Sequence, residues 1–254
     1  MSTEAIDQST NQANNANSQS TLGSNVDAAE IAKFEALAHL WWDENSQFKP
    51  LHDINPLRCN YIDERSPLSG KNVIDIGCGG GILAEAMAKR GASVTGIDMG
   101  REPLEVAKLH QVESNLNIDY QQITAEEIAD REPEQYDIVT CLEMLEHVPE
   151  PSSVIQACAK LCKPGGHIYF ATINRNPKAF AFAIVGAEYL LNMLPKGTHE
   201  YAKFIRPAEL ADWARDAGLI PQDVTGMSYN PIFKSYKFGS DVGVNYITHI
   251  SKPA

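Results

Sequence analysis

The stretch Val73-Ile74-Asp75-Ile76-Gly77-Cys78-Gly79-Gly80-Gly81 decides the fold. A short run of branched apolar residues ends in a turn that is almost entirely glycine, and a helical pattern follows from position 82. Glycine lets the backbone turn sharply and lets another group approach without meeting a Cβ atom. Ligands of open α/β sheets bind at the carboxyl ends of strands. The turn is therefore predicted to be the centre of a ligand-binding site.

The chain on either side of this turn alternates between strand-like and helix-like segments. Alternation at this spacing predicts a doubly wound α/β fold, with a mostly parallel sheet covered by helices on both faces. The expected strands are 72–76, 93–98, 118–123, 136–141, 167–172, 219–225 and 244–251. The expected helices are 82–90, 102–114, 125–130, 151–162 and 207–217.

Three further segments are distinguished from this main domain, which covers 71–254. Residues 1–25 are polar and nearly free of large apolar side chains, which predicts a disordered tail. Residues 26–70 are expected to form a helical cap, with a helix over 28–42 and a short helical stretch around Asn60–Arg65. Segment 174–200 interrupts the alternation and is read as an insertion.

Composition limits the classes of partner. The chain has 254 residues, 43% of them hydrophobic, and a formal net charge of -12, with no cluster of basic residues. This balance argues against a nucleic-acid partner and favours a small-molecule substrate. The 5 cysteines form no Cys-x-x-Cys pair, and the N-terminus resembles no secretory signal, so a reduced cytoplasmic location is expected.

The spacing of the glycines indicates the cofactor. A dinucleotide fingerprint would place its third glycine at position 82, which is Ile82, so an NAD-dependent dehydrogenase is a remote alternative. Asp75 precedes the turn of Gly77 and Gly79 by two positions, and an acidic group there suits the cationic sulfonium of S-adenosylmethionine (SAM).

A second acidic residue supports the same cofactor. Asp98 ends the next strand, where a carboxylate can accept hydrogen bonds from both ribose hydroxyls. Met99 would then offer a polarizable surface to the adenine. Either feature alone also fits a plain turn or a helix cap. Together, and in this order, they predict SAM binding.

Residues 72–172 resemble the class I SAM-dependent methyltransferases through VIDIGCGGG, GIDM, YDIVTCLEMLEHV and LCKPGGHIYFAT. The resemblance implies a seven-stranded sheet whose last strand is antiparallel. It also implies that Gly77 and its turn hold the methionine part of SAM and that Asp98 holds the ribose. Ala125 and Glu126 would border the adenine, and Leu142 would contact the cofactor near its reacting end.

The flanking segments narrow the resemblance. EIAKFEALAHLWWDENSQFKPLHDINPLR, EPLEVAKLH, CLEMLEHVPEP, TINRNPKAFAFAIVGAEYLLNMLPKGTHEY and KFIRPAEL are similar to the bacterial ubiquinone-biosynthesis O-methyltransferases, over about 26–252. That family implies methylation of catechol-type hydroxyls on polyprenylated rings, of the 2-polyprenyl-6-hydroxyphenol and 3-demethylubiquinol types, and other enzymes of that pathway as partners.

By the same resemblance Arg58 would pair with the methionine carboxylate, although it also fits a surface arginine. Three alternatives are a C-methyltransferase, an N-methyltransferase and a SAM-binding protein without catalysis.

Glu143, Glu146 and His147 are residue types that could activate a phenol. A phenol has a pKa of about 10, so its oxygen needs a general base or a divalent cation to react at neutral pH. Glu143 and His147 are the candidate catalytic residues, with His147 as a base. A second interpretation, which the resemblance implies, is that all three side chains are Mg²⁺ ligands. A third is that they have only a structural role.

Residues 179–194 (AFAFAIVGAEYLLNML) form an apolar run in the inserted segment, with one charged residue. The run is short for crossing a bilayer. It is interpreted as a core helix or substrate lid, or as a helix resting on the membrane surface, which would make the protein peripheral to the cytoplasmic membrane.

Overall fold

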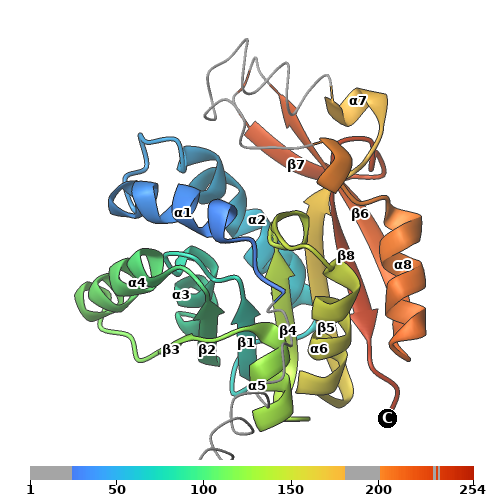
Figure 1. Cartoon of the computed structure of the whole chain (residues 1–254), viewed down its shortest axis with the longest axis horizontal. Helices are drawn as coiled ribbons and strands as arrows, with labels where there is room; N and C mark the ends of the chain where they lie inside the picture. Colours follow the sequence, from blue (N-terminus) through green and yellow to red (C-terminus); the bar gives the residue numbers. More distant parts are fainter. Residues whose placement is uncertain (1–24, 181–200, 231–232, 234) are drawn as a thin grey trace, which may run out of the picture.

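The computed structural model describes residues 25–180, 201–230, 233 and 235–254. One eight-stranded sheet, in the order β3-β2-β1-β4-β5-β8-β6-β7, forms its centre (Figure 1). The first five strands along the chain are parallel. They are β1 Asn72–Ile76, β2 Ser93–Asp98, β3 Asp119–Gln122, β4 Tyr136–Leu142 and β5 Cys162–Ile173. The α/β class and the mostly parallel sheet are therefore confirmed.

The other end of the sheet is antiparallel and carries one strand more than the seven expected. β8 (Asn245–Ser251) runs antiparallel to β5, as expected for the last strand, and β6 (Ile220–Asn230) runs antiparallel to β8. β6 continues past position 225 and forms a hairpin with β7 (Ser235–Gly239). β7 is short, and its side chains alternate between exposed and half-buried, so its apolar content is too low to stand out in the sequence.

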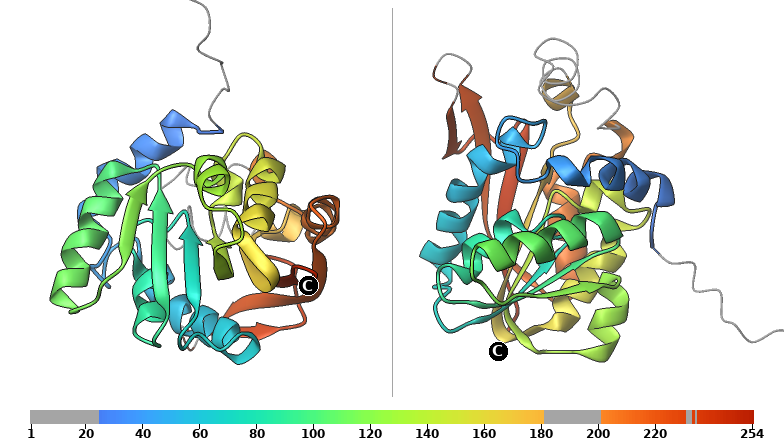
Figure 2. Two further views of the ribbon diagram at one scale, coloured as in Figure 1. Left: turned by 90° about the horizontal axis from the view of Figure 1, so that it is seen from below. Right: turned by 90° about the vertical axis from the view of Figure 1, so that its left-hand side faces the viewer.

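Helices cover both faces of the sheet (Figure 2). α5, α6 and α8 pack their apolar sides on one face, and α3 and α4 pack on the other together with α2 from the N-terminal region. Both faces of the parallel strands are consequently buried, which accounts for their near-continuous apolar sequences. The bounds are α3 Ile82–Ala88, α4 Arg101–Glu113, α5 Ala125–Arg131, α6 Pro151–Leu161 and α8 Pro207–Asp216.

The N-terminal region contains α1 (Ala28–Leu37), the 3-10 turn η1 (Ala38–Leu40) and α2 (Lys49–Arg65). The helix α2 is much longer than the stretch around Asn60–Arg65 that the sequence predicts. Pro50 lies in the first turn, where no intrahelical N–H is needed. Pro56 lies inside the helix, and the burial of Cys59, Tyr61 and Ile62 against the sheet outweighs the lost hydrogen bond.

Two tryptophans attach this region to the carboxyl-end edge of the sheet, across which α1 lies (Figure 1). The indole Nε1–H of Trp42 donates to the Gly80 carbonyl at 2.8 Å. Its ring stacks on His110 of α4, with ring centroids 3.4 Å apart and an interplanar angle of 4°. Trp41 packs with Phe48 and Ile82 in a separate apolar cluster. The helical region is therefore a cap placed directly over the glycine turn.

The insertion begins and ends beside one strand. The short helix α7 (Pro177–Ala179) follows β5, and the Ile205 N–H returns to the Ile173 carbonyl at 3.0 Å. Most of the apolar run 179–194 lies outside the described residues, as does nearly all of the predicted tail 1–25. Among the helices that the structure describes, none has the length and apolar character needed to span a bilayer. The 5 cysteines are all buried and free, so no disulfide forms.

The hairpin offers a matched test of the fold. A Cβ at Gly226 would overlap the Asp241 main chain, whereas a Cβ at its cross-strand partner Gly239 would meet nothing within 4 Å. Gly226→Ala is expected to lower the free energy of unfolding by about 1–3 kcal/mol. Gly239→Ala is expected to stay within about 1 kcal/mol of the parent. Urea denaturation of both variants measures this, and equal losses would contradict the described packing.

Candidate active site

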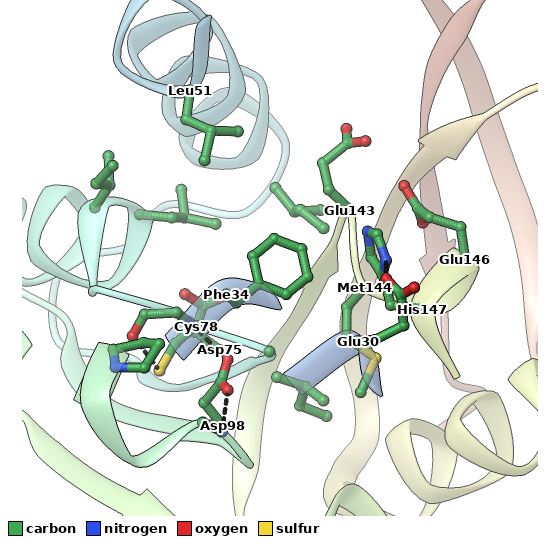
Figure 3. Close-up of a pocket in the computed structure, with 18 of the residues that line it drawn as sticks. Glu30, Phe34, Leu51, Asp75, Cys78, Asp98, Glu143, Met144, Glu146 and His147 are labelled. Atoms are coloured by element: carbon green, nitrogen blue, oxygen red, sulfur yellow. Dashed lines mark hydrogen bonds and ion pairs between the residues drawn. The ribbon is translucent and has the colours of Figure 1, made fainter. Parts of the chain in front are cut away.

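A cavity of about 940 Å³ lies between the cap and the carboxyl ends of β1, β2 and β4 (Figure 3). All of the residues that the sequence predicts for the site contribute to its lining. They are Arg58, Asp75, Gly77, Gly79, Asp98, Met99, Ala125, Glu126, Leu142, Glu143, Glu146 and His147.

The glycine turn forms the floor of this cavity. Gly77, Gly79 and Gly81 have φ angles of 72°, 52° and 86°, in the left-handed region that side chains with a Cβ rarely adopt. The N–H groups of Gly77 and Cys78 both donate to the Ile97 carbonyl at 2.9 Å, which ties the turn to the end of β2. The turn is thus held open toward the cavity.

Trp41 of the cap lies directly on this turn. A Cβ at either Gly79 or Gly80 would overlap its indole ring, and a Cβ at Gly77 would overlap the Met144 side chain. Glycine is therefore required here by close packing as well as by backbone geometry. The sequence gives no sign of this role, because Trp41 reads only as an apolar residue at helical spacing.

Asp98 joins the turns after β1 and β2. Its carboxylate accepts hydrogen bonds from the N–H groups of Gly79 at 2.9 Å and Gly100 at 2.7 Å. Burial raises the pKa of Asp98, and these backbone donors partly oppose the rise. Met99 follows at the cavity wall, with its carbonyl held by Gln122 at 2.9 Å. The carboxylate lies beside the turn, as the sequence predicts.

Asp75 provides a second acidic group in the cavity lining. It is 3% exposed and accepts a hydrogen bond from the Thr140 hydroxyl at 2.6 Å. Burial raises its pKa to about 7; the Thr140 hydrogen bond and the positive charge of Arg58 oppose the rise, and the negative charge of Asp98 adds to it. Two buried carboxyl groups near one turn favour a cationic ligand.

The first residues of α5 also line the cavity. Thr124 caps this helix in a capping box with Glu127. The Glu126 carboxylate accepts hydrogen bonds from Asn25 at 3.0 Å and from Ser153 at 2.7 Å. Ala125 and Glu126 therefore border the cavity where the first described residue of the cap is anchored.

Glu143 lies just past β4 in a strained conformation, with φ of 56°. Its carboxylate forms an ion pair with the largely buried Arg58 of α2, and its N–H donates to the Ala171 carbonyl at 2.8 Å. Among the described residues, Arg58 Nε is buried without a hydrogen-bond partner. Arg58 is thus a cavity residue, and the surface-arginine alternative is wrong.

Glu146 and His147 belong to the 3-10 turn η2 (Leu145–His147), not to an α-helical turn. Glu146 is 3% exposed, and one carboxylate oxygen accepts from the Thr172 hydroxyl at 2.8 Å. Burial, together with the negative charge of Glu143, raises the pKa of Glu146. The protonated, neutral form of Glu146 is therefore favoured.

His147 is oriented by a residue that sequence reasoning missed. Its Nδ1 lies 2.8 Å from the carboxylate of Glu30, in the first turn of α1 (Figure 3). Burial opposes ionisation of Glu30, but hydrogen bonds from Lys33 and His147 lower its pKa overall. Phe34 packs edge-on against the imidazole, with ring centroids 5.1 Å apart. A single acid in an amphipathic helix carries no sequence signal for such contacts.

The predicted Mg²⁺ ligands line one cavity but each side chain engages a different protein group. Arg58 holds Glu143, Thr172 holds Glu146, and Glu30 holds His147. Within the described ranges, no group of three or more His, Cys, Asp or Glu side chains is arranged to hold a metal ion. In this arrangement the three side chains do not form a Mg²⁺ site.

The sequence matches known proteins over most of its length. Residues 51–222 match the model of a methyltransferase domain. A ubiquinone biosynthesis O-methyltransferase of Pseudomonas savastanoi pv. phaseolicola is 68% identical over 231 residues, covering 91% of this chain and 100% of the relative. Another, from Pseudomonas paraeruginosa, is 65% identical over the same shares of both chains.

Solved structures support the fold. A possible histamine N-methyltransferase from Thermotoga maritima has a TM-score of 0.62 at 18% identity, covering 88% of this chain and 99% of that chain. A magnesium protoporphyrin IX methyltransferase from Synechocystis, solved with bound SAH, has a TM-score of 0.59 at 18% identity, covering 87% of each chain. These two likenesses show the fold, and the relatives of 65% and 68% identity contradict the dehydrogenase alternative.

The glycine turn, the two buried carboxyl groups and these matches agree with one another: the chain belongs to the SAM-dependent ubiquinone biosynthesis O-methyltransferase family.

Proposed function

We propose that the protein transfers the methyl group of SAM to a catechol-type hydroxyl of polyprenylated rings, of the 2-polyprenyl-6-hydroxyphenol and 3-demethylubiquinol types. One observation carries the proposal: a single cavity joins the acidic glycine turn to the His147–Glu30 pair. The names of the relatives identify the pathway. A cavity with these two ends can hold a cationic methyl donor beside a phenol and a base.

The lining residues fit SAM. Asp98 suits the ribose hydroxyls, and Met99 and Ala125 offer apolar surface to the adenine. Arg58 is a cation in the cavity lining that would pair with the methionine carboxylate, and Leu142 would contact the cofactor near its reacting end. When bound, SAM supplies an electrophilic methyl group on a positively charged sulfur. Asp75 stabilises that positive charge from beneath the turn.

His147 is proposed as the general base. The Glu30 carboxylate accepts a hydrogen bond from Nδ1–H, and in that tautomer Nε2 is the nitrogen that can take up a proton. A phenol hydroxyl that donates to Nε2 becomes more nucleophilic as its proton is withdrawn. Glu143, which Arg58 holds in place, is an acceptor for the neighbouring hydroxyl of a catechol. Mg²⁺ held by Glu143, Glu146 and His147 is the second candidate, in which the cation would lower the phenol pKa instead.

Contact with a membrane surface through 179–194 is proposed as well, because a polyprenyl substrate resides in membranes. In the described part of that segment Phe180 is 44% exposed. Lys178 immediately precedes the segment. The protein would then act as a peripheral enzyme at the cytoplasmic face of the membrane. Contact with other enzymes of ubiquinone biosynthesis is expected from the pathway alone.

The pH dependence of SAM binding tests the role of Asp75. Its pKa of about 7 means that the carboxyl gains a proton below neutral pH, and the protonated form cannot stabilise the sulfonium. Affinity for SAM should fall as pH decreases, approaching tenfold per unit below about 7. Calorimetry should show a shallower slope for Asp75→Asn. S-adenosylhomocysteine, which lacks the sulfonium charge, is the matched ligand. Identical slopes for the parent and Asp75→Asn would refute this role.

Methyl transfer to a short-chain 2-prenyl-6-hydroxyphenol, followed by mass spectrometry, tests the reaction and its base. Removal of a general base should lower kcat of His147→Gln by about 10²-fold or more, with little change in the KM for SAM. Glu30→Gln should have a smaller effect in the same direction, since it only disorients the ring. A parent enzyme that methylates no catechol-type substrate would disprove the proposed function.

The same assay separates the two candidates for activating the phenol. Enzyme treated with EDTA should retain its activity if His147 acts alone. Loss of activity on EDTA treatment, with recovery on addition of Mg²⁺, would favour the metal and contradict the base acting alone.

Liposome flotation tests membrane contact. Phe180→Asp combined with Leu191→Asp should reduce the fraction of protein that floats with anionic vesicles, because charge in the apolar run opposes insertion. Leu109→Asp is the control, since Leu109 is 69% exposed on α4, outside the inserted segment. Equal flotation of parent and double variant, with intact thermal unfolding, would count against the contact.

A further inference from the structure

The cavity continues beyond its charged end into a part with a different lining. Here the walls are the start of α2 and the β6–β7 hairpin. Among the described residues, those that line this part of the cavity from positions 47–54 and 227–236 carry no charge. They include Phe48, Leu51, Ile54, Met227, Tyr229 and Tyr236. We call these six residues the apolar wall.

Each half of the apolar wall follows from the period of its element. Leu51 and Ile54 are three residues apart, on one side of α2. Met227 and Tyr229 are two residues apart, on one face of β6. Tyr236 pairs with Tyr229 across the hairpin, with ring centroids 4.7 Å apart. Ile54 and Met227 are only 5% and 8% exposed. The wall is therefore a formed surface inside the cavity.

Three contacts between α2 and the β6–β7 hairpin hold the halves of the wall at a fixed separation. The ring of Tyr61 in α2 packs on Phe238 in β7, with centroids 5.2 Å apart, and its hydroxyl donates to Asp223 in β6 at 2.8 Å. Arg65 of α2 adds an ion pair to the same carboxylate at 2.9 Å. The apolar wall is thus braced from behind by contacts that do not enter the cavity.

The wall adjoins the groups assigned to the reaction. Arg58 lies one helical turn after Ile54, and its ion pair with Glu143 marks the charged end. Figure 3 shows Leu51 projecting from α2 into the cavity that Glu143 and His147 also line. A hydrocarbon chain attached to a ring at the charged end must extend away from that end. The apolar wall, which adjoins it, offers the path along which no charged group loses its hydration.

We propose that the apolar wall between α2 and the β6–β7 hairpin binds the first isoprene units of the substrate's tail. The inference rests on the proposed function, since it takes the ring of that substrate to lie beside His147. The wall makes affinity depend on the hydrocarbon tail, and it leaves the positions of SAM and of the reacting hydroxyl unchanged. Leu51 and Met227 are thereby specificity-determining residues.

The test uses the full-length enzyme and a series of 6-hydroxyphenols that carry zero, one, two or three isoprene units at position 2. For the parent, kcat/KM should increase with the first units added and then level off. Leu51→Gln and Met227→Gln should each raise the KM for the two-unit substrate by about tenfold, the loss expected when about two CH₂ groups are no longer well buried. Kinetics with the tailless substrate should change by much less. Leu109→Gln, the same substitution at an exposed position of α4, should behave as the parent throughout.

Binding of S-adenosylhomocysteine, measured by calorimetry, confirms that each variant remains folded. If the parent methylates the tailless and prenylated substrates with equal kcat/KM, the tail site is disproved while the proposed function stands. The same holds if both wall variants lose activity equally on every substrate. If the parent methylates none of them, the proposed function fails, and the tail site fails with it.

Discussion

The left-handed backbone of the turn between β1 and α3 sets the geometry of the carboxyl-end edge of the sheet. Three glycines there have positive φ angles, which residues with a Cβ avoid, and in this conformation main-chain N–H groups of the turn donate to partners at the end of β2. Asp98 is fixed by one of them, the N–H of Gly79. The indole of Trp41 occupies the space that side chains at Gly79 and Gly80 would fill. The turn thus determines where the acidic group lies and how closely the cap can approach.

The cap is a part of the site as well as its cover. α1 contributes Glu30, which orients His147, and α2 contributes Arg58, which holds Glu143. The two candidate catalytic side chains, both from the loop after β4, therefore receive their positions from a segment that precedes the whole sheet. Because these contacts join distant parts of the chain, the reacting end forms only when the cap is docked. The buried carboxyl groups, whose charges are costly without a partner, suit a cationic cofactor.

The antiparallel end of the sheet has a related role. β6 and β7 extend past the sheet core as a hairpin, and α2 packs against it through Tyr61 and Phe238. This packing adds an uncharged wall to a cavity whose other end is charged. A molecule with a polar aromatic ring and a hydrocarbon tail matches both ends at once.

Local sequence patterns were enough to predict the α/β class, most strand positions and a part of the cavity lining. Period-two and period-3.6 patterns and the glycine spacing are local, so they can be read without knowing what packs against what. Only the tertiary structure decided the full length of α2, because packing of Tyr61 and Ile62 outweighs Pro56, and it alone revealed β7, whose apolar pattern is weak. The same applies to Glu30 and Trp41. Their roles are set by contacts with His147 and Gly79, distant in sequence, and residue type alone cannot predict such contacts.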